Sequence, residues 1–534
     1  MKWIRPTSGG WLLGLLVVSA SSTAAQDVLK EWSIRRGSSL SAESLPDLDG
    51  DGFRELLWGD PVFGEGNQNH HQGRVVAFSS RTGEVLYERR GTARAVFFGG
   101  PMELVGDLSG DGFPDIIAGS GGDGTYFLNG RDGSVLHHVP WSAGQILPLS
   151  DVDRDGIDEY FLTLGVFLGR TFEFKYQIYV EPVIGFGFEG TEMDDVDGDG
   201  LADFAIGAPG DYWFNLYDPG VVFVYSGATG ALLYRSESPD PKDPGLPNFY
   251  GESLCSPGDL NGDGIGDLVV GASLAGPAPT YRGALFLLDG PTGALIARID
   301  AGEGVTKLGG LDVMGPAGDV NGNGMGDFLV FARQVNDPLV LLVDGTGEIL
   351  YSVPASGSPI LGGHDWNGDG FPDFLLRTRP NTGVTLYSGA PPGISVLGLP
   401  CTAPASPRIG ATGSPRIGER FEIHLTDVPA DVPAMLVGDP SPPLDVKCPL
   451  LRAPQRLRSM RTKELRPGEG VATVAIDLPP DPALIGSVLY LQWLAAVPAG
   501  GRSFSTTRVL RVEIQAEGAS RASLPDPSSL LLVR

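Results

Sequence analysis

A nine-residue loop occurs seven times along the chain, and no other sequence feature limits the possible folds as strongly. Its pattern is Asp-x-Asp/Asn-x-Asp-Gly-x-x-Asp, with minor exchanges, and each copy leads into an apolar run. Repetition at intervals of 44 to 64 residues is typical of folds in which each unit buries its apolar face against the next. The copies begin at Asp47, Asp107, Asp151, Asp195, Asp259, Asp319 and Asp365.

Positions 1, 3, 5 and 9 of each loop are predicted to bind calcium. Calcium takes six to eight oxygen ligands, and a tight loop with Gly at position 6 brings its odd positions to one centre. Cys and His are absent from these positions, which argues against softer metals. Up to seven ions are expected. The predicted ligands are Asp47, Asp49, Asp51, Glu55, Asp107, Ser109, Asp111, Asp115, Asp151, Asp153, Asp155, Glu159, Asp195, Asp197, Asp199, Asp203, Asp259, Asn261, Asp263, Asp267, Asp319, Asn321, Asn323, Asp327, Asp365, Asn367, Asp369 and Asp373.

Asp-Gly and Asn-Gly are also common turn residues, so a simple hairpin turn is the alternative interpretation of each loop. A turn does not require an acid at position 9, whereas a cation does, and seven copies favour the metal site. Ligand charge then ranks the sites. Repeats 1, 3 and 4 have four acids each, whereas repeat 6 has only Asp319 and Asp327, which predicts the weakest site.

Each repeat has the pattern of four short strands. In repeat 5 these are residues 248–254 before the loop, then 268–273, 283–289 and 294–298. Seven such units predict an all-β fold, a seven-bladed β-propeller with calcium-binding loops. The segment Val28–Arg35 resembles the fourth strand of the first unit, and we expect it to complete the last blade.

Gly-Ala-Pro at Gly207–Pro209 and Phe-Tyr-Gly at Phe249–Gly251 accompany the seven loops. These residues resemble the FG-GAP repeats of the integrin alpha-chain propeller and of its secreted bacterial relatives. The resemblance covers residues 27–400. It implies that the loop acids at the positions given above bind calcium, and that the protein serves in cell adhesion. Repeat 5 departs from it with Gly-Ala-Ser, and the aromatic run Phe167–Phe188 in repeat 3 predicts an irregular blade.

The two ends of the chain differ in composition from the repeats. Residues 1–25 resemble a signal peptide, since their apolar run is shorter than the roughly 20 residues of a membrane anchor. This predicts a secreted or cell-surface protein, extracellular or periplasmic, without membrane insertion after removal of the signal. Residues 401–516 have the short apolar strands of a β-sandwich-like accessory domain, and 517–534 a Ser/Pro-rich composition that predicts disorder. Cys401 and Cys448 could form a disulfide.

No nucleophile motif, phosphate loop or zinc-binding spacing is found in the sequence. The paired acids all belong to the predicted calcium-binding loops, so none is left to act as a catalytic acid or base. Neighbouring residues on a strand point to opposite faces, so neither His70–His71 nor His137–His138 is expected to chelate one ion. We expect both pairs to be exposed histidines in loops. A formal net charge of −27 argues against nucleic acid as partner. We expect a secreted, non-enzymatic, calcium-binding module for extracellular protein or glycan. The alternatives are a calcium-dependent carbohydrate-active enzyme (polysaccharide lyase or hydrolase) and a structural extracellular spacer.

Overall fold

The structure is a computed structural model of the chain. It describes residues 28–33, 41–64, 71–92, 95–142, 146–162, 165–178, 186–187, 189–210, 220–240, 248–276, 281–302, 305–310, 314–334, 338–354, 359–366, 371–378, 383–389, 394–397, 408–412, 415, 420–429, 431–439, 455–466, 469–478, 480–496, 504–507, 509–514 and 531–533. The predicted signal peptide and both Cys401 and Cys448 lie outside these residues.

The described residues form antiparallel sheets and one short 3-10 turn, η1 (Pro482–Leu484), as the all-β prediction requires. No described helix has the length and apolar character needed to cross a membrane. The first four sheets take their strands in chain order. Their strands are β2 (Ser41–Leu45), β3 (Glu55–Asp60), β4 (Arg74–Phe78) and β5 (Val85–Arg90); β6 (Met102–Val105), β7 (Asp115–Ser120), β8 (Gly124–Leu128) and β9 (Val135–Val139); β10 (Ile146–Leu149), β11 (Glu159–Leu162), β12 (Gly165–Phe167) and β13 (Phe174–Gln177); and β14 (Gly190–Met193), β15 (Asp203–Ala208), β16 (Val221–Tyr225) and β17 (Leu232–Glu237).

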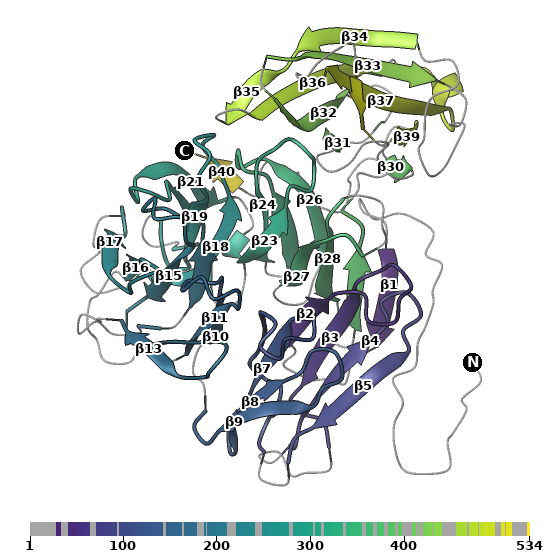
Figure 1. Cartoon of the computed structure of the whole chain (residues 1–534). Helices are drawn as coiled ribbons and strands as arrows, with labels where there is room; N and C mark the ends of the chain where they lie inside the picture. The colour runs from purple at the N-terminus through teal and green to yellow at the C-terminus, as the bar shows by residue number, and fades with distance from the viewer. Residues whose placement is uncertain are drawn as a thin grey trace.

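Three further sheets continue the same order and complete a ring (Figure 1). Their strands are β18 (Tyr250–Gly258), β19 (Asp267–Ala272), β20 (Ala284–Leu288) and β21 (Leu295–Ala301); β22 (Val305–Lys307), β23 (Met314–Gly318), β24 (Asp327–Gln334), β25 (Leu339–Val343) and β26 (Ile349–Pro354); and β27 (Pro359–His364), β28 (Asp373–Thr378), β29 (Gly383–Tyr387) and β1 (Val28–Ser33). We number these sheets blades 1 to 7 in the order of their metal loops. Blade 3 contains β12, which with β22 is one of the two shortest of these strands and ends where the region predicted to be irregular begins.

Strand β1 closes the ring. It pairs antiparallel with β29, so that Val28 lies opposite Tyr387 and Ser33 opposite Gly383. The N-terminal strand therefore supplies the outer edge of blade 7, and the prediction for this segment is confirmed. Trp58 of blade 1 and Leu375 of blade 7 belong to one buried apolar cluster, so the last blade also packs against the first.

At three junctions, a tyrosine on the outer strand of one blade contacts a glycine turn in the next. The Tyr87 hydroxyl donates to the Gly130 carbonyl at 2.7 Å, and the Tyr234 hydroxyl to that of Gly290 at 2.6 Å. The Tyr176 hydroxyl bonds Gly227 in the same way. At the turn residue Gly293, a Cβ atom would lie 2.6 Å from the Tyr234 ring, so the ring occupies the space that glycine leaves.

The junction between blades 2 and 3 uses a different pair. Its turn has Phe172 at φ +59° in place of glycine, and His137 stacks on this ring at 4.4 Å between centroids. His138 points to the other face of β9 and lies 4.4 Å from the Tyr126 ring. The expectation of a loop is wrong for this pair, because both residues belong to strand β9. His138 is exposed, as expected, whereas His137 is partly buried. His70 lies outside the described residues, and His71 is partly buried.

A second unit follows the ring, as two stacked sheets. Trp493 and Leu436 from one sheet and Ile423 from the other are fully buried between them. Strand β30 already belongs to this sandwich because it pairs with β39, so the sandwich begins before residue 401. The strands are β30 (Ile394–Leu397), β39 (Val509–Glu513), β37 (Val488–Ala496), β38 (Phe504–Thr506), β33 (Pro433–Asp439) and β34 (Gln455–Arg461); and β31 (Arg408–Thr412), β32 (Arg420–Pro429), β36 (Glu469–Asp477) and β35 (Lys463–Arg466).

The C-terminal segment returns to the ring. Strand β40 (Leu531–Val533) pairs antiparallel with β21 at the outer edge of blade 5, where Figure 1 shows it in yellow. The expectation of a disordered tail over 517–534 does not hold for these three residues. An unpaired outer strand offers a row of backbone donors and acceptors, and an apolar segment of the same chain satisfies part of that row.

Candidate metal centres

All the metal loops lie at one end of the ring. Each connects the innermost strand of a blade to its second strand, and antiparallel order places the turn between the third and fourth strands at the same end. We call this the loop end. The connections between second and third strands, and between successive blades, lie at the opposite end. The predicted ligands are thus gathered on one face, with separate turns available to approach them.

The carboxylate at position 1 organises the loop. In repeat 4, Asp195 Oδ1 accepts from the backbone N–H groups of Gly198 at 2.7 Å and Asp199 at 3.0 Å, and its Oδ2 from Gly200 at 2.7 Å. Gly198 and Gly200 have φ near +82° and +85°, a region that disfavours side chains. Asp47, Asp107 and Asp259 accept the corresponding bonds in their loops. The protein backbone therefore forms the curled loop by itself.

The acid at position 9 opens the second strand of each blade and is buried. In repeat 4, Asp203 Oδ2 accepts from Val196 N–H at 2.9 Å, and its Oδ1 accepts from Gly227 N–H at 3.0 Å. Burial, with a smaller contribution from the nearby Asp197, raises the pKa of Asp203 to about 6, although the hydrogen bonds from Gly227 and Val196 act in the opposite direction. Burial likewise raises the pKa of Glu159 to about 7. These carboxylates lie inside the protein beside other acids, which is an arrangement that a cation would stabilise.

Three loops bring their acids within range of a single ion. In each group, one ligand oxygen per residue lies within 4.8 Å of all the others, which suits Ca–O distances of about 2.3–2.6 Å. Asp155 and Asp203 lie outside the groups of their own loops. Asn367 and Asp369 of repeat 7 are outside the described residues. The groups are Asp47, Asp49, Asp51 and Glu55; Asp151, Asp153 and Glu159; and Asp195, Asp197 and Asp199.

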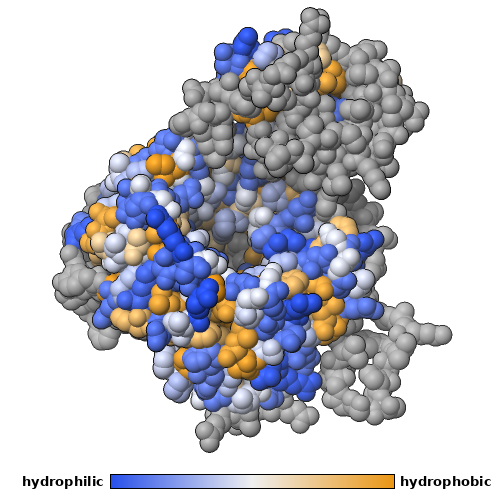
Figure 2. Space-filling model, in the orientation of Figure 1, coloured by the Kyte–Doolittle hydropathy of each residue, from blue (hydrophilic) through white to orange (hydrophobic). Residues whose placement is uncertain are grey.

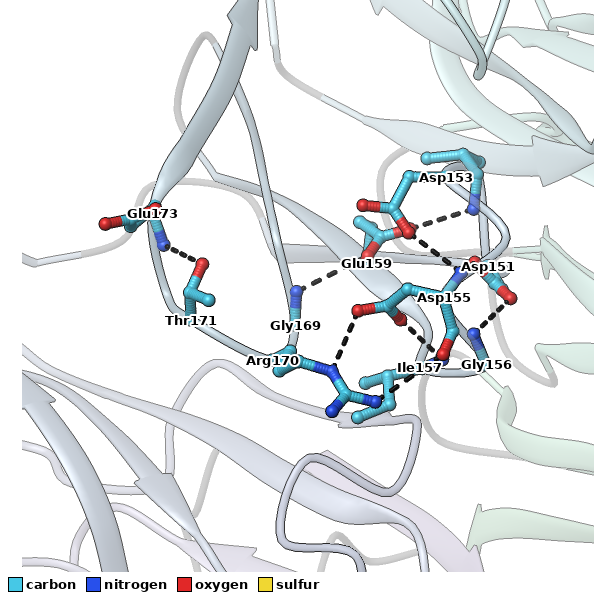
Figure 3. A network of polar contacts seen from close by, with 11 residues as sticks. Asp151, Asp153, Asp155, Gly156, Ile157, Glu159, Gly169, Arg170, Thr171 and Glu173 are labelled. Atoms are coloured by element: carbon cyan, nitrogen blue, oxygen red, sulfur yellow. Dashed lines mark hydrogen bonds and ion pairs between the residues drawn. The ribbon is translucent and has the colours of Figure 1, made fainter.

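Repeat 3 differs from repeats 1 and 4 because an arginine pairs with the side-chain carboxylate of one of its predicted ligands (Figure 3). In repeat 1, the arginine of the corresponding turn, Arg81, donates to the backbone carbonyl of Asp51 at 3.5 Å. Arg170, in the turn between β12 and β13, donates from Nε to Asp155 Oδ2 at 2.9 Å. A second arginine, Arg154, donates from the loop itself to the Asp199 carbonyl of repeat 4 at 2.9 Å. Ranking by acid count places repeat 3 among the strongest sites. The guanidinium of Arg170 argues against that rank, since it competes with a cation for Asp155.

We expect Arg170→Gln to tighten calcium binding at repeat 3. The pair is partly exposed, and such pairs contribute up to about 1 kcal/mol, so the affinity should rise about 5-fold. Calorimetric titration of single-site variants measures this change. Arg131→Gln is the matched control, because Arg131 occupies the corresponding turn of blade 2 and lies over the Phe113 ring at 5.1 Å. An unchanged affinity in Arg170→Gln would contradict the competition.

Two loops recruit residues that the nine-residue pattern does not contain. In repeat 2, Asn129 Nδ2 donates to Asp111 Oδ2 at 3.0 Å and to Ser109 Oγ at 3.1 Å. In repeat 5, Asn261 Nδ2 donates to Asp289 Oδ1 at 2.9 Å. The sequence could have indicated Asn129 and Asp289 as further loop partners, since each belongs to an Asn-Gly or Asp-Gly pair that directly follows the third strand of its blade.

Among the loops that the structure describes completely, that of repeat 6 is the most enclosed. Asp327 and Asn321 are fully or almost fully buried, at 0% and 2% exposure. Asp327 Oδ2 accepts from Val320 N–H at 2.8 Å, but its Oδ1 and Asn321 Nδ2 have no hydrogen-bond partner. Burial raises the pKa of Asp327, and Asp319 and Asp344 raise it further. A buried carboxylate oxygen without a partner, beside two other acids, fits a bound cation.

A separate acid pair lies on the innermost strands. Glu43 of β2 and Glu103 of β6 share a side-chain hydrogen bond across the junction of blades 1 and 2. Innermost strands border the centre of a propeller, and Figure 2 shows a hollow there. Burial raises the pKa of Glu103 to about 7 and that of Glu43 well above its usual value, with the neighbouring Glu103 adding to the latter shift.

This pair should make the folded protein less stable as the pH rises. A carboxyl with a raised pKa in the folded state keeps its proton there up to a higher pH than in the unfolded chain, so its contribution is lost between about pH 4.5 and 7. We expect a fall on the order of 2 kcal/mol between pH 5 and 8. Urea unfolding in excess calcium measures it. The double variant Glu43→Gln/Glu103→Gln should flatten the profile, and Glu84→Gln, an exposed acid, should not.

The chain resembles known proteins in its repeats. Residues 250–288 match the FG-GAP repeat family. Integrin alpha-5 of Xenopus laevis is 28% identical over 214 residues, which cover 34% of this chain and 20% of that protein. Integrin alpha-X of Mus musculus is 29% identical over 229 residues (41% and 16%), and integrin alpha-8 of Gallus gallus 25% identical over 304 residues (45% and 28%). The chain thus spans less than a third of these relatives, and the predicted resemblance is confirmed, whereas the bacterial source stays a prediction.

Proposed function

On the premise that this chain carries FG-GAP repeats like those of integrin alpha chains, we propose that it is a secreted, calcium-stabilised binding module for an extracellular protein or glycan, without enzymatic activity. The observation that carries the proposal is the use of the repeated acids. Asp195 and its counterparts accept backbone hydrogen bonds within their own loops, and Asp203 and its counterparts are buried against the next turn. The acids therefore support the ring, and ligand binding is left to other surfaces.

Calcium is the cation that we propose for the loops. The donor sets consist of carboxylate, amide and hydroxyl oxygens, which suit a hard cation of flexible coordination. The loop acids predicted as ligands would hold it, with Asp47, Asp49, Asp51 and Glu55 as the most complete group. When bound, calcium would neutralise acids that otherwise repel one another. Export to a calcium-rich compartment, as residues 1–25 predict, would keep weak sites filled.

We place the ligand site at the end of the ring opposite the loop end. Strand order places the end of β15 and the start of β16 there, and residues 209–220 connect these two strands. Two exposed aromatic residues also lie there, Trp141 between β9 and β10 and Phe97 between β5 and β6, at 49% and 38% exposure. Aromatic side chains offer large apolar surfaces to protein and glycan ligands at a low entropic cost. Phe97 has φ +57°, so its backbone is held in an uncommon conformation.

The acid pair Glu43–Glu103 does not favour a glycosidase. Its carboxyl groups are directly hydrogen-bonded, whereas the two acids of glycosidases are about 5 Å or more apart, on either side of the bond that they cleave. A shared proton between touching carboxyls leaves no room for a sugar between them. We therefore assign the pair to the junction of the blades.

Binding of the mature protein to arrays of extracellular proteins and glycans tests the proposal. We expect selective binding that Trp141→Ala and Phe97→Ala weaken at unchanged melting temperature. Phe174→Ala is the matched control, because Phe174 is more exposed than either residue, at 55%, but lies on the outer strand of blade 3. Loss of binding in the control alone would contradict the assigned end of the ring. Cleavage of any array glycan would contradict the absence of enzymatic activity.

A further inference from the structure

The loops of repeats 6 and 7 contact the C-terminal sandwich. Gly50 and Gly198, at position 4 of repeats 1 and 4, are exposed, and a Cβ atom on either would meet nothing within 4 Å. Gly322, at the same position of repeat 6, is buried, and a Cβ there would lie 2.5 Å from the Gly410 Cα of β31. A Cβ on Gly410 would in turn lie 2.4 Å from the Asn321 carbonyl oxygen. Two backbones therefore meet without room for a side chain.

A side chain from repeat 7 makes a second contact. Phe371, at position 7 of that loop, is 2% exposed and belongs to the apolar core of the sandwich, together with Ile409 and Phe421. The residues at the corresponding position of repeats 1 and 2, Phe53 and Phe113, are more exposed. The sandwich therefore rests on the loop end of blades 6 and 7, by a backbone contact on one loop and an apolar anchor on the next.

The covered loop is also the one with the fewest acids. Asn321 and Asn323 stand where repeat 4 has Asp197 and Asp199. An acid in place of the buried Asn321 would lose its hydration beneath Gly410, which is costly for a charged group. The remaining acids, Asp319 and Asp327, flank the segment that touches the sandwich. Because Asp327 Oδ1 has no hydrogen-bond partner, a cation bound there would fix both ends of this segment.

We propose that the loop of repeat 6, together with the apolar contact of Phe371, forms a cation-dependent joint for the C-terminal sandwich. Calcium at repeat 6 holds Gly322 in the position that fits Gly410, and the seated sandwich in turn tightens calcium at repeat 6. This inference rests on the proposed calcium binding. The two effects must be equal in size, because coupling between two binding events is reciprocal. A Cβ atom at position 4 of repeats 1, 2 and 4 would meet nothing within 4 Å, so these repeats should bind calcium independently of the sandwich.

The first test compares Asp319→Asn in repeat 6 with Asp195→Asn in repeat 4 in the full chain. Both variants remove the acid that organises the loop. Calcium per chain is counted by mass spectrometry, and seating of the sandwich is followed by small-angle scattering and by proteolysis between the two units. We expect each variant to lose one ion, while only Asp319→Asn increases the radius of gyration and the cleavage rate.

The second test changes no ligand. Gly410→Ala should weaken calcium at repeat 6 by about 5- to 150-fold, the usual range of such coupling, and leave the other sites unchanged. Gly315→Ala is the matched control, because a Cβ on Gly315 would meet nothing within 4 Å. If Asp319→Asn does not fold, this second test still shows whether calcium binding at repeat 6 is coupled to the seating of the sandwich.

The outcomes separate this inference from the proposed function. A wild-type protein that binds no calcium at any loop would overturn the proposed function, and the joint with it. Loss of one ion from Asp319→Asn with the sandwich still seated would overturn the joint alone. An unchanged ion count in Asp319→Asn, or an unchanged affinity in Gly410→Ala, would do the same.

Discussion

Removing calcium should lower the melting temperature of the mature protein by on the order of 10 °C and open the loop end to proteases. At free calcium 100 times the dissociation constant, each filled site adds about 2.7 kcal/mol to the free energy of unfolding, and several sites act together. The physical reason is the burial of acids such as Asp203 and Glu159 beside further carboxylates. Differential scanning calorimetry with calcium and with excess chelator measures the shift.

A charge-matched pair of variants controls this experiment. Asp197→Asn removes one carboxylate from the group in repeat 4, and Glu84→Gln removes one from an exposed turn. We expect the first to reduce the calcium-dependent shift and the second to preserve it. Equal shifts in both variants would mean that overall negative charge, and not the loop, responds to calcium.

Deleting residues 26–35 should destabilise the ring more than any single substitution. It removes β1 and its ladder to β29, at about 1 kcal/mol for each lost hydrogen bond, and leaves β29 as an unpaired edge. We therefore expect a loss of several kcal/mol together with self-association. Urea unfolding and light scattering measure the two effects.

A peptide in trans provides the control for the deletion. A synthetic peptide with the sequence of residues 26–35 should restore the monomer and part of the lost stability, whereas a scrambled peptide should not. Restoration by both peptides would show that β1 acts by composition alone. A deletion variant as stable and monomeric as the full chain would contradict the role of β1 in closure.

Much of the ring could be predicted because the recurring loop marks the position of each repeat in the sequence. The segment Val28–Arg35 was assigned to the last blade by its likeness to Val85–Arg90, and β1 pairs there. The metal loops are equally readable, since Asp195 and its counterparts organise local backbone turns that depend on neighbours within five residues. Loops whose hydrogen bonds are local and whose pattern recurs along the chain can therefore be predicted from the sequence.

The contacts that were missed join residues far apart in sequence. Arg170 contacts Asp155 from another turn of its blade. No feature of the repeat pattern predicts that the sandwich contacts Gly322. Glu43 and Glu103 meet across two blades, although both stand four residues before their loops, so an alignment of the repeats would have marked them. Such pairs form only when the blades are assembled into the ring, so the sequence of a single repeat does not reveal them.

The junctions between blades also bear on which blade may stand beside which. A tyrosine faces a turn glycine at three junctions, as with Tyr234 and Gly293, whereas His137 faces Phe172 at the junction of blades 2 and 3. Exchanging only one member of either pair would bring two rings into collision or leave a gap. These pairs therefore exclude mismatched neighbours at the junction of blades 2 and 3, whereas the three Tyr–Gly junctions are alike. A shuffled or duplicated blade would pack well only where its outer ring fits the turn of the next blade, so blade 3, with Phe172 in its turn, could not follow a blade whose outer strand carries the tyrosine.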